Sequence, residues 1–174
     1  MKPTLNNPVQ KIIIHHTAVS HGLNPDQWVA TNADHKARFD FMSSLGYYVG
    51  YTYEISATGQ VRQARKEGEE TAAVIGENRR SISICLDGNF DMEMPTLAQA
   101  QALKKLMTEI IARWGLTPHK IFPHRDFCGT PPYKSCYGNL LPDNWGQLVC
   151  LYDNLDQLLA RPLGGIYQPR MEAE

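Results

Sequence analysis

The sequence predicts a single α/β domain in which a central mixed β-sheet is flanked by helices. Short β-branched or alternating runs, typical of strands, recur between longer segments with helical spacing. No internal repeat or linker interrupts this alternation, and 174 residues suit one domain with one core. We therefore expect one domain over 1–174, with its core at about 10–160 and a peripheral tail at 161–174.

The first half of the chain predicts a strand, a helix and a hairpin. Lys11–His15 is a continuous apolar, β-branched run, which favours a strand buried on both faces of a sheet. An asparagine–proline pair then predicts the start of a helix over 24–42. The segments 51–55 and 61–65 flank a turn that contains glycine, and so predict two short strands in a hairpin.

The second half predicts two strands, each followed by a helix. Ser81–Leu86 alternates small polar and apolar residues before an Asp-Gly turn, which indicates a strand. A capping box opens a helix over 96–115 with apolar residues at helical spacing and a terminal glycine. The apolar segment 120–123 is a short strand that ends at a histidine, and 143–159 predicts a last amphipathic helix.

Composition and charge narrow the classes of partner. Hydrophobic residues make up 43% and charged residues 20% of the chain, as in ordinary globular proteins. A net charge of −1 lacks the positive surplus that nonspecific nucleic-acid binding uses, and no apolar run approaches the ~20 residues that cross a bilayer. The N-terminus has no secretion signal. We expect a soluble monomer made in the cytoplasm, with no nucleic-acid partner and no membrane insertion.

Two histidines and one cysteine stand out as metal-capable side chains. His15 and His124 end predicted strands, where a rigid sheet can aim them into a cleft, and Cys136 lies in the following loop. Three such ligands leave the fourth tetrahedral position of a zinc ion open, as in catalytic zinc sites. Zinc acidifies water and polarises carbonyls, so an amide would be a suitable substrate. Taken singly, each histidine is more often structural or solvent-exposed.

The remaining histidines and cysteines have simpler interpretations. His16 follows His15 on an extended strand, so its side chain should point to the opposite face of the sheet. The cysteines are too few and too scattered for a disulfide framework, and free thiols are expected. Cys85 fits a small core hydrophobe. Solvent or packing positions are expected for His21, His35 and His119.

Four segments form an ordered set of motifs. They are Ile12-Ile13-Ile14-His15-His16-Thr17-Ala18, Gly50-Tyr51-Thr52-Tyr53 with Gly59, Asn78 with Ser81-Ile82-Ser83-Ile84 and Gly88-Asn89-Phe90, and His124-Arg125-Asp126 with Lys134-Ser135-Cys136. Spanning roughly Lys11 to Trp145, they closely resemble the zinc-dependent N-acetylmuramoyl-L-alanine amidases, which include phage lysozyme-type amidases and animal peptidoglycan recognition proteins. The resemblance implies the peptidoglycan recognition protein-like amidase fold.

The resemblance implies a role for each matching position. His15, His124 and Cys136 match the three ligands of one zinc ion. Tyr51 matches a tyrosine that orients or deprotonates water, and Lys134 matches a lysine that stabilises the negative charge on the carbonyl oxygen. Without the resemblance, these last two would be an ordinary strand aromatic and a solvated loop charge. We also expect Asn78, in the third segment, to contact substrate.

The chain also departs from the family pattern. The segment 124–136 is longer than in close relatives and contains Cys128, an alternative third ligand. The usual Cys-Pro-Gly has become Cys136-Tyr137-Gly138, and Ala73 replaces a family histidine. These changes bear on the substrate contacts. A bridge between Cys128 and Cys150 in an oxidising compartment is a further alternative that the sequence leaves open.

The resemblance implies hydrolysis of the amide bond between N-acetylmuramic acid and L-alanine in bacterial peptidoglycan. With no secretion signal and no separate wall-binding domain, the chain looks like a single-domain phage or prophage endolysin. Such an enzyme is made in the host cytoplasm and reaches the cell wall after another protein opens the membrane. Two alternatives are an amidase of anhydro-muropeptides in wall recycling and a module that binds peptidoglycan without cutting it. Cys136 argues against the second.

Overall fold

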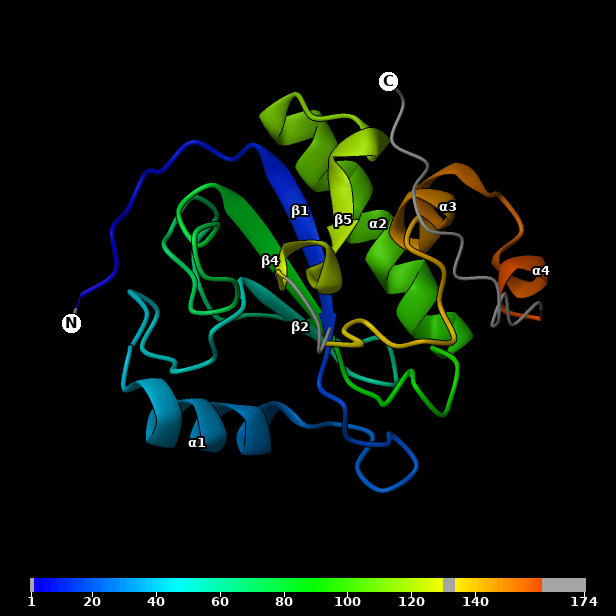
Figure 1. The fold of residues 1–174 in the computed structure, drawn as a ribbon, viewed down its shortest axis with the longest axis horizontal. Coiled ribbons are helices and arrows are strands. Elements are labelled where there is room, and N and C mark those ends of the chain that lie inside the picture. The colour runs from blue at the N-terminus through cyan, green and yellow to red at the C-terminus, as the bar shows by residue number, and fades with distance from the viewer. Residues whose placement is uncertain (1, 130–133, 161–174) are drawn as a thin grey trace.

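The computed structural model describes residues 2–129 and 134–160. Its centre is a five-stranded sheet in the order β3-β2-β4-β1-β5 (Figure 1). β3 is antiparallel to β2, while the other neighbours pair in parallel, so the sheet is mixed. The predicted single α/β domain is confirmed. The strands are β1 (Lys11–His16), β2 (Tyr53–Ile55), β3 (Val61–Gln63), β4 (Ser81–Leu86) and β5 (Ile121–Pro123).

β1 lies inside the sheet because its side chains are apolar on both faces. Ile12, Ile13 and Ile14 have no exposed surface. The strand pairs with β4 on one side and β5 on the other, which places Ile14 opposite both Ile84 and Pro123. Burying an isoleucine side chain contributes about 1.5–3 kcal/mol, so these three fix the strand firmly. The residues that follow them in β1, His15 and His16, are therefore held in fixed positions.

α2 (Leu97–Trp114) is the longest helix and packs on one face of this sheet. Its predicted capping box is present, because Thr96 accepts the N–H of Gln99 while the Gln99 side chain accepts the N–H of Thr96. Gly115 ends the helix with a left-handed backbone at φ 63°. The buried side of the helix carries Leu103, Leu106, Met107 and Ile110.

α3 (Trp145–Leu151) covers the same face beside α2. Gly146 lets it approach β1, since a Cβ there would lie 2.5 Å from Ile14 Cδ1. The predicted last helix over 143–159 is wrong as one element, because the backbone turns extended at Tyr152. A second helix, α4 (Leu155–Leu159), starts where the Asn154 side chain accepts the N–H of Gln157.

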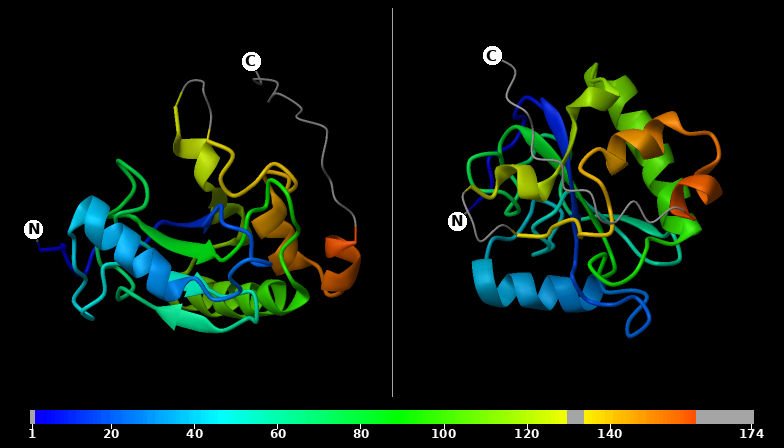
Figure 2. Two further views of the ribbon diagram at one scale, coloured as in Figure 1. Left: turned by 90° about the horizontal axis from the view of Figure 1, so that it is seen from below. Right: turned by 45° about the vertical axis from the view of Figure 1, so that its right-hand side comes forward.

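α1 (Trp28–Phe39) lies apart from α2 and α3, near the end of the sheet where the parallel strands finish (Figures 1 and 2). It is shorter than the predicted helix over 24–42. Asn24 accepts the N–H of Asp26 in a local turn, so the helix begins only at Trp28. It ends where Asp40 adopts a left-handed backbone at φ 42°.

The hairpin strands are also shorter than the predicted segments 51–55 and 61–65. The Thr52 carbonyl accepts the N–H groups of both Ala64 and Arg65, which breaks the regular ladder at that end. Two short 3-10 helices flank β5, namely η1 (Pro118–Lys120) and η2 (His124–Phe127). The predicted peripheral tail at 161–174 lies outside the described residues. None of the helices in the described ranges is both long and apolar enough to cross a membrane.

Candidate metal centre

His15 and His124 meet because they lie at the ends of neighbouring parallel strands, His15 as the penultimate residue of β1 and His124 directly after β5. Ile14 and Pro123 are partners in the register of β1 and β5, and each histidine is the next residue of its chain segment. Their ring centroids are 4.6 Å apart. Cys136 reaches them from the loop after η2, with its Sγ 4.0 Å from His15 Nδ1. The structure thus brings together the three residues that the sequence proposed as ligands, with ligand atoms all within 4.8 Å of one another.

The chemistry of these side chains fits a zinc ion. His15 is 1% exposed, and its Nε2 has no hydrogen-bond partner among the described residues. Burial lowers the pKa of His15 well below its usual value and that of His124 to about 4, so both imidazoles are neutral and offer lone pairs. Burial also raises the pKa of the Cys136 thiol to about 12 when no cation balances it. A soft cation would balance this set of two nitrogens and one sulfur.

His16 lies on the other face of the strand, as its position next to His15 predicts. Its Nδ1 accepts the N–H of Phe90 at 3.1 Å, and its ring packs on the Phe90 ring. Only its backbone turns toward the centre, where its N–H donates to Cys136 Sγ at 3.4 Å. The side chain of His16 therefore has a structural role, in which it holds the loop after β4 through Phe90.

Cys128, the alternative third ligand, lies outside the cluster. Its thiol faces the His124 carbonyl at 3.4 Å, whereas the group of ligand atoms around His15 contains Cys136. All four cysteines are free, so Cys128 and Cys150 are not bridged in this structure.

Tyr51 lies beside the cluster, held between two imidazoles. Its ring centroid is 5.0 Å from that of His15 and 5.2 Å from that of His35. Its hydroxyl is hydrogen-bonded to the thiol of Cys85, and burial raises its pKa well above the usual value. The phenol is therefore a neutral donor next to His15.

His35 takes a more specific position than the predicted solvent or packing role. It is the buried residue of α1, and its Nδ1 accepts the N–H of Gly50 at 2.9 Å. Burial lowers its pKa to about 4, which keeps the acceptor nitrogen unprotonated. His35 thus fixes the residue before Tyr51. A lone histidine in a polar helix gives no sequence signal for this contact, because the contact depends on where α1 lies.

Lys134 is exposed and follows the undescribed segment 130–133 in the chain. Its positive charge contributes to the lowered pKa of both His15 and His124. The ammonium is therefore near enough to influence a charge that develops over the cluster.

Asn78 stabilises a loop. Its Oδ1 accepts hydrogen bonds from Thr71 Oγ1 and from the N–H groups of Ala73 and Val74. The same loop joins the Tyr51 segment, because the Ala72 N–H donates to the Gly50 carbonyl. A direct contact between Asn78 and substrate stays a prediction.

A second buried polar cluster lies in the same row of side chains as His15. Glu54, Cys85 and His15 occupy matched positions on adjacent strands. Glu54 is 2% exposed and Asp87 is 1% exposed, and their carboxyls interact, but neither Glu54 oxygen has a hydrogen-bond donor among the described residues. Burial and the Asp87 charge raise the pKa of Glu54, while burial raises that of Asp87 less. Asp87 Oδ2 accepts the N–H of Gln27 at 2.7 Å, just before α1. A single proton held between the two carboxyls would supply the missing donor and is consistent with the raised pKa of Glu54.

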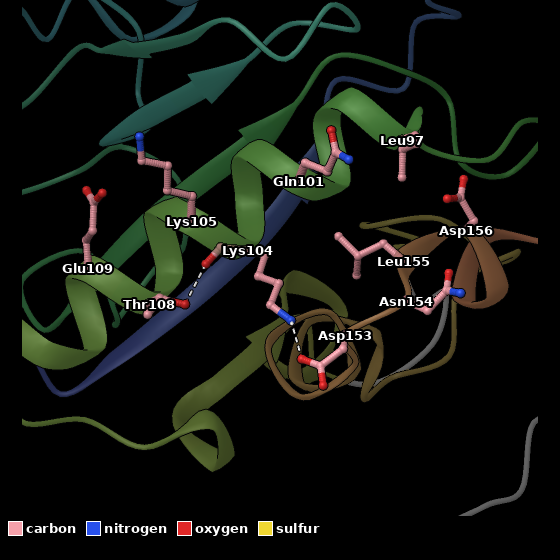
Figure 3. A pocket seen from close by; sticks show the side chains of 10 residues that line it. All are labelled: Leu97, Gln101, Lys104, Lys105, Thr108, Glu109, Asp153, Asn154, Leu155 and Asp156. Atoms are coloured by element: carbon pink, nitrogen blue, oxygen red, sulfur yellow. Dashed lines mark hydrogen bonds and ion pairs between the residues drawn. The ribbon is translucent and has the colours of Figure 1, made fainter.

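A surface groove of about 830 Å³ lies elsewhere, between α2 and the start of α4. Lys104 of α2 and Asp153 face each other across it in Figure 3. None of the predicted site residues lines this groove. Its walls carry charges of both signs and no aromatic side chain.

Comparison with known proteins agrees with this geometry. A family model described as N-acetylmuramoyl-L-alanine amidase matches residues 5–139. A peptidoglycan recognition protein of Trichoplusia ni is 30% identical over 139 residues, covering 78% of this chain and 75% of that protein. A peptidoglycan-recognition protein of Drosophila melanogaster is 29% identical over 117 residues, which is 67% of this chain but only 63% of the relative.

Two solved structures from Clostridium intestinale URNW have a similar fold. They are the N-acetylmuramoyl-L-alanine amidase LysC and the endolysine amidase LysCS, each 25% identical with a TM-score of 0.64. Each similarity covers 79% of this chain, and 81% or 80% of the solved chain. The match over residues 5–139 includes β1 through η2 and Cys136. The chain therefore belongs to the N-acetylmuramoyl-L-alanine amidase family.

Proposed function

We propose that the protein is a zinc-dependent amidase that hydrolyses the bond between N-acetylmuramic acid and L-alanine in bacterial peptidoglycan. The observation that carries this proposal is the group of His15, His124 and Cys136, whose ligand atoms lie within 4.8 Å of one another. Family members that bind peptidoglycan without cutting it have no need for a third, thiolate ligand. The three donors leave one position of a tetrahedral ion free for chemistry.

Bound at these three residues, zinc would supply a Lewis acid that polarises a carbonyl and acidifies water. The chain's own residues complete the chemistry. We assign to Tyr51, a neutral phenol beside His15, the role of hydrogen-bonding and orienting the attacking water, for which its hydroxyl would exchange the Cys85 thiol for the water. The Lys134 ammonium, whose charge reaches His15 and His124, would stabilise the negative charge that develops on the amide oxygen.

The biological setting that we propose is lysis. The similarity to the endolysine amidase LysCS supports a phage or prophage endolysin, made in the host cytoplasm and acting after the membrane is opened. The substrate partner would be peptidoglycan, and the acting unit a monomer. An amidase of soluble anhydro-muropeptides would use the same residues, so the substrate must be tested directly.

Mass spectrometry of digested peptidoglycan tests the bond and the cofactor together. Purified walls treated with the protein should release intact stem peptides that begin with L-alanine, and a chelator should stop the release until zinc is restored. Cleavage of soluble anhydro-muropeptides with intact walls left uncut would favour the recycling role. Binding to walls without any released peptide would show a recognition module and contradict the amidase.

A further inference from the structure

The cysteine ligand is supplied by irregular backbone, unlike the two histidines. Residues 134–141 form neither a helix nor a strand, whereas His15 lies within the paired strand β1 and His124 follows β5 directly. A loop without a ladder depends on side chains and turns to satisfy its backbone groups and to fix its path. The position of the Cys136 sulfur is therefore set by whatever holds this loop.

Arg125, next to the ligand His124, holds one side of the loop. Its N–H donates to the Cys136 carbonyl at 2.7 Å. Its guanidinium donates to the carbonyls of Ser135, Gly138 and Leu141, at 3.3, 2.9 and 2.7 Å. These bonds link the loop to the segment of the second histidine.

Asp91, in the loop after β4, holds the other side. Ser135 Oγ donates to Asp91 Oδ2 at 2.6 Å, and the Asn139 N–H donates to Asp91 Oδ1 at 2.8 Å. One carboxylate therefore joins the residue immediately before Cys136 to a residue shortly after it. Both bonds use a charged acceptor, which makes them stronger than bonds between neutral groups.

The segment that carries Asp91 is itself anchored to β1. The neighbouring Phe90 donates its N–H to His16 Nδ1 and accepts the N–H of Leu140 at 3.0 Å. Gly138 packs so closely on Phe90 that a Cβ would collide with the Phe90 backbone. A chain of hydrogen bonds and neighbouring residues thus connects β1 to the cysteine loop, by way of His16, Phe90 and Asp91.

We propose that Asp91 is a positioning residue for Cys136 and sets how tightly the centre holds its metal. It touches neither the ligand atoms nor Tyr51, and acts through Ser135 and Asn139. The inference rests on the proposed zinc site, and adds a residue that the sequence analysis did not single out. Groups that hold a metal ligand in place commonly change metal affinity about 10–100-fold when removed.

The test measures the zinc dissociation constant by competition with a chromogenic chelator, using the full chain. Asp91→Ala should weaken zinc binding by about 10–100-fold. Asp91→Asn and Ser135→Ala, which each leave part of the contact, should weaken it less. Because both act through one contact, Ser135→Ala should add little to Asp91→Ala in the double variant. Cobalt in place of zinc should show a weakened thiolate absorption band in Asp91→Ala.

Asp153→Ala is the matched control, since this exposed carboxylate pairs with Lys104 in the described part of the chain and lies away from the centre. It should bind zinc as the wild type does. The melting temperature of each metal-free variant shows whether it folds. If Asp91→Ala does not fold, the zinc constants of the milder variants Asp91→Asn and Ser135→Ala provide the test. Zinc constants within twofold of wild type in folded Asp91 variants would overturn the inference alone. A wild-type protein that binds no zinc would overturn the proposed function as well.

Discussion

The candidate metal centre and the Glu54–Asp87 pair lie in one row of side chains on the same sheet, and the two clusters differ in the positive partner that their chemistry suits. In both places, lone pairs are buried next to one another and need a positive partner. The centre gathers two neutral nitrogens and a sulfur, and His15 Nε2 has no partner among the described residues. The acid pair gathers two carboxyls, which a single proton can join.

The difference lies in what surrounds each cluster. The carboxyl pair is buried next to the start of α1, where the Gln27 N–H donates to Asp87. Asp26 raises and Arg62 lowers the pKa of Asp87, so the charges facing the pair partly offset one another. The centre instead includes partly exposed residues and the exposed Lys134. Cluster chemistry and access together therefore favour a metal at one end of the row and a proton at the other.

Removing a ligand should have the largest effect. His15→Ala or Cys136→Ala should abolish turnover, because two remaining donors cannot hold zinc in a tetrahedral site. His16→Ala should leave much of the activity, since the His16 ring binds Phe90 on the opposite face. Zinc content and released stem peptides measure both effects. Equal activity in the Cys136 variant would transfer the ligand role to Cys128.

Changing the groups beside the metal should separate turnover from metal binding. Tyr51→Phe and Lys134→Ala should keep their zinc but turn over about 10²–10³-fold more slowly, because each removes stabilisation of the reacting groups. Zinc content measured alongside kcat tests the separation. A zinc content that falls in step with activity would contradict the assigned roles.

The ionised member of the acid pair should matter for stability. Asp87→Asn should lower the free energy of unfolding by about 1.5–3 kcal/mol near neutral pH, because the Gln27 N–H loses a charged acceptor. Denaturant unfolding of the metal-free protein measures this, with Asp156→Asn at an exposed site as the control. A loss no greater than that of the control would mean that Asp87 carries no charge here.

Replacing Glu54, the protonated member of the pair, should have the smallest effect. Near alkaline pH it should raise the free energy of unfolding, whereas Asp87→Asn should lower it. A raised Glu54 pKa means that the folded chain holds its proton more tightly than the unfolded chain. The contribution of Glu54 to the free energy of unfolding should therefore fall as pH rises from the ordinary glutamate range toward the raised pKa, whereas the lowered pKa values of His15, His35 and His124 act in the opposite direction up to the ordinary histidine range. Glu54→Gln has no such proton to lose.

The free energy of unfolding of the wild type minus that of Glu54→Gln should accordingly fall from pH 5 to pH 9, because the histidine contributions are common to both proteins. At the alkaline end Glu54→Gln should be more stable than the wild type by about 1 kcal/mol. The amide can still donate to Asp87. If the pH dependence were the same in both proteins, or if Glu54→Gln were clearly less stable than the wild type at alkaline pH, Glu54 would not hold the proton. The contrast drawn between the two clusters would then be wrong.

Local sequence signals were sufficient for the elements that depend on local chemistry. The β-branched run of β1, the capping box of α2 and its terminal Gly115 each describe neighbouring residues, and the structure has all three. The segment 143–159 shows the limit. Apolar spacing continued through it, while the break at Tyr152 and the new cap at Asn154 divided it into two helices.

The candidate site divides in the same way. The ends of two strands, together with the resemblance, indicated His15, His124 and Cys136 from sequence alone. The contacts of His35 with Gly50, of Asp91 with Ser135, and of Glu54 with Asp87 join segments distant in the chain or on different strands. Only the tertiary structure could decide these, because hydrophobic periodicity fixes which face of an element is buried and carries no information on which polar groups meet there.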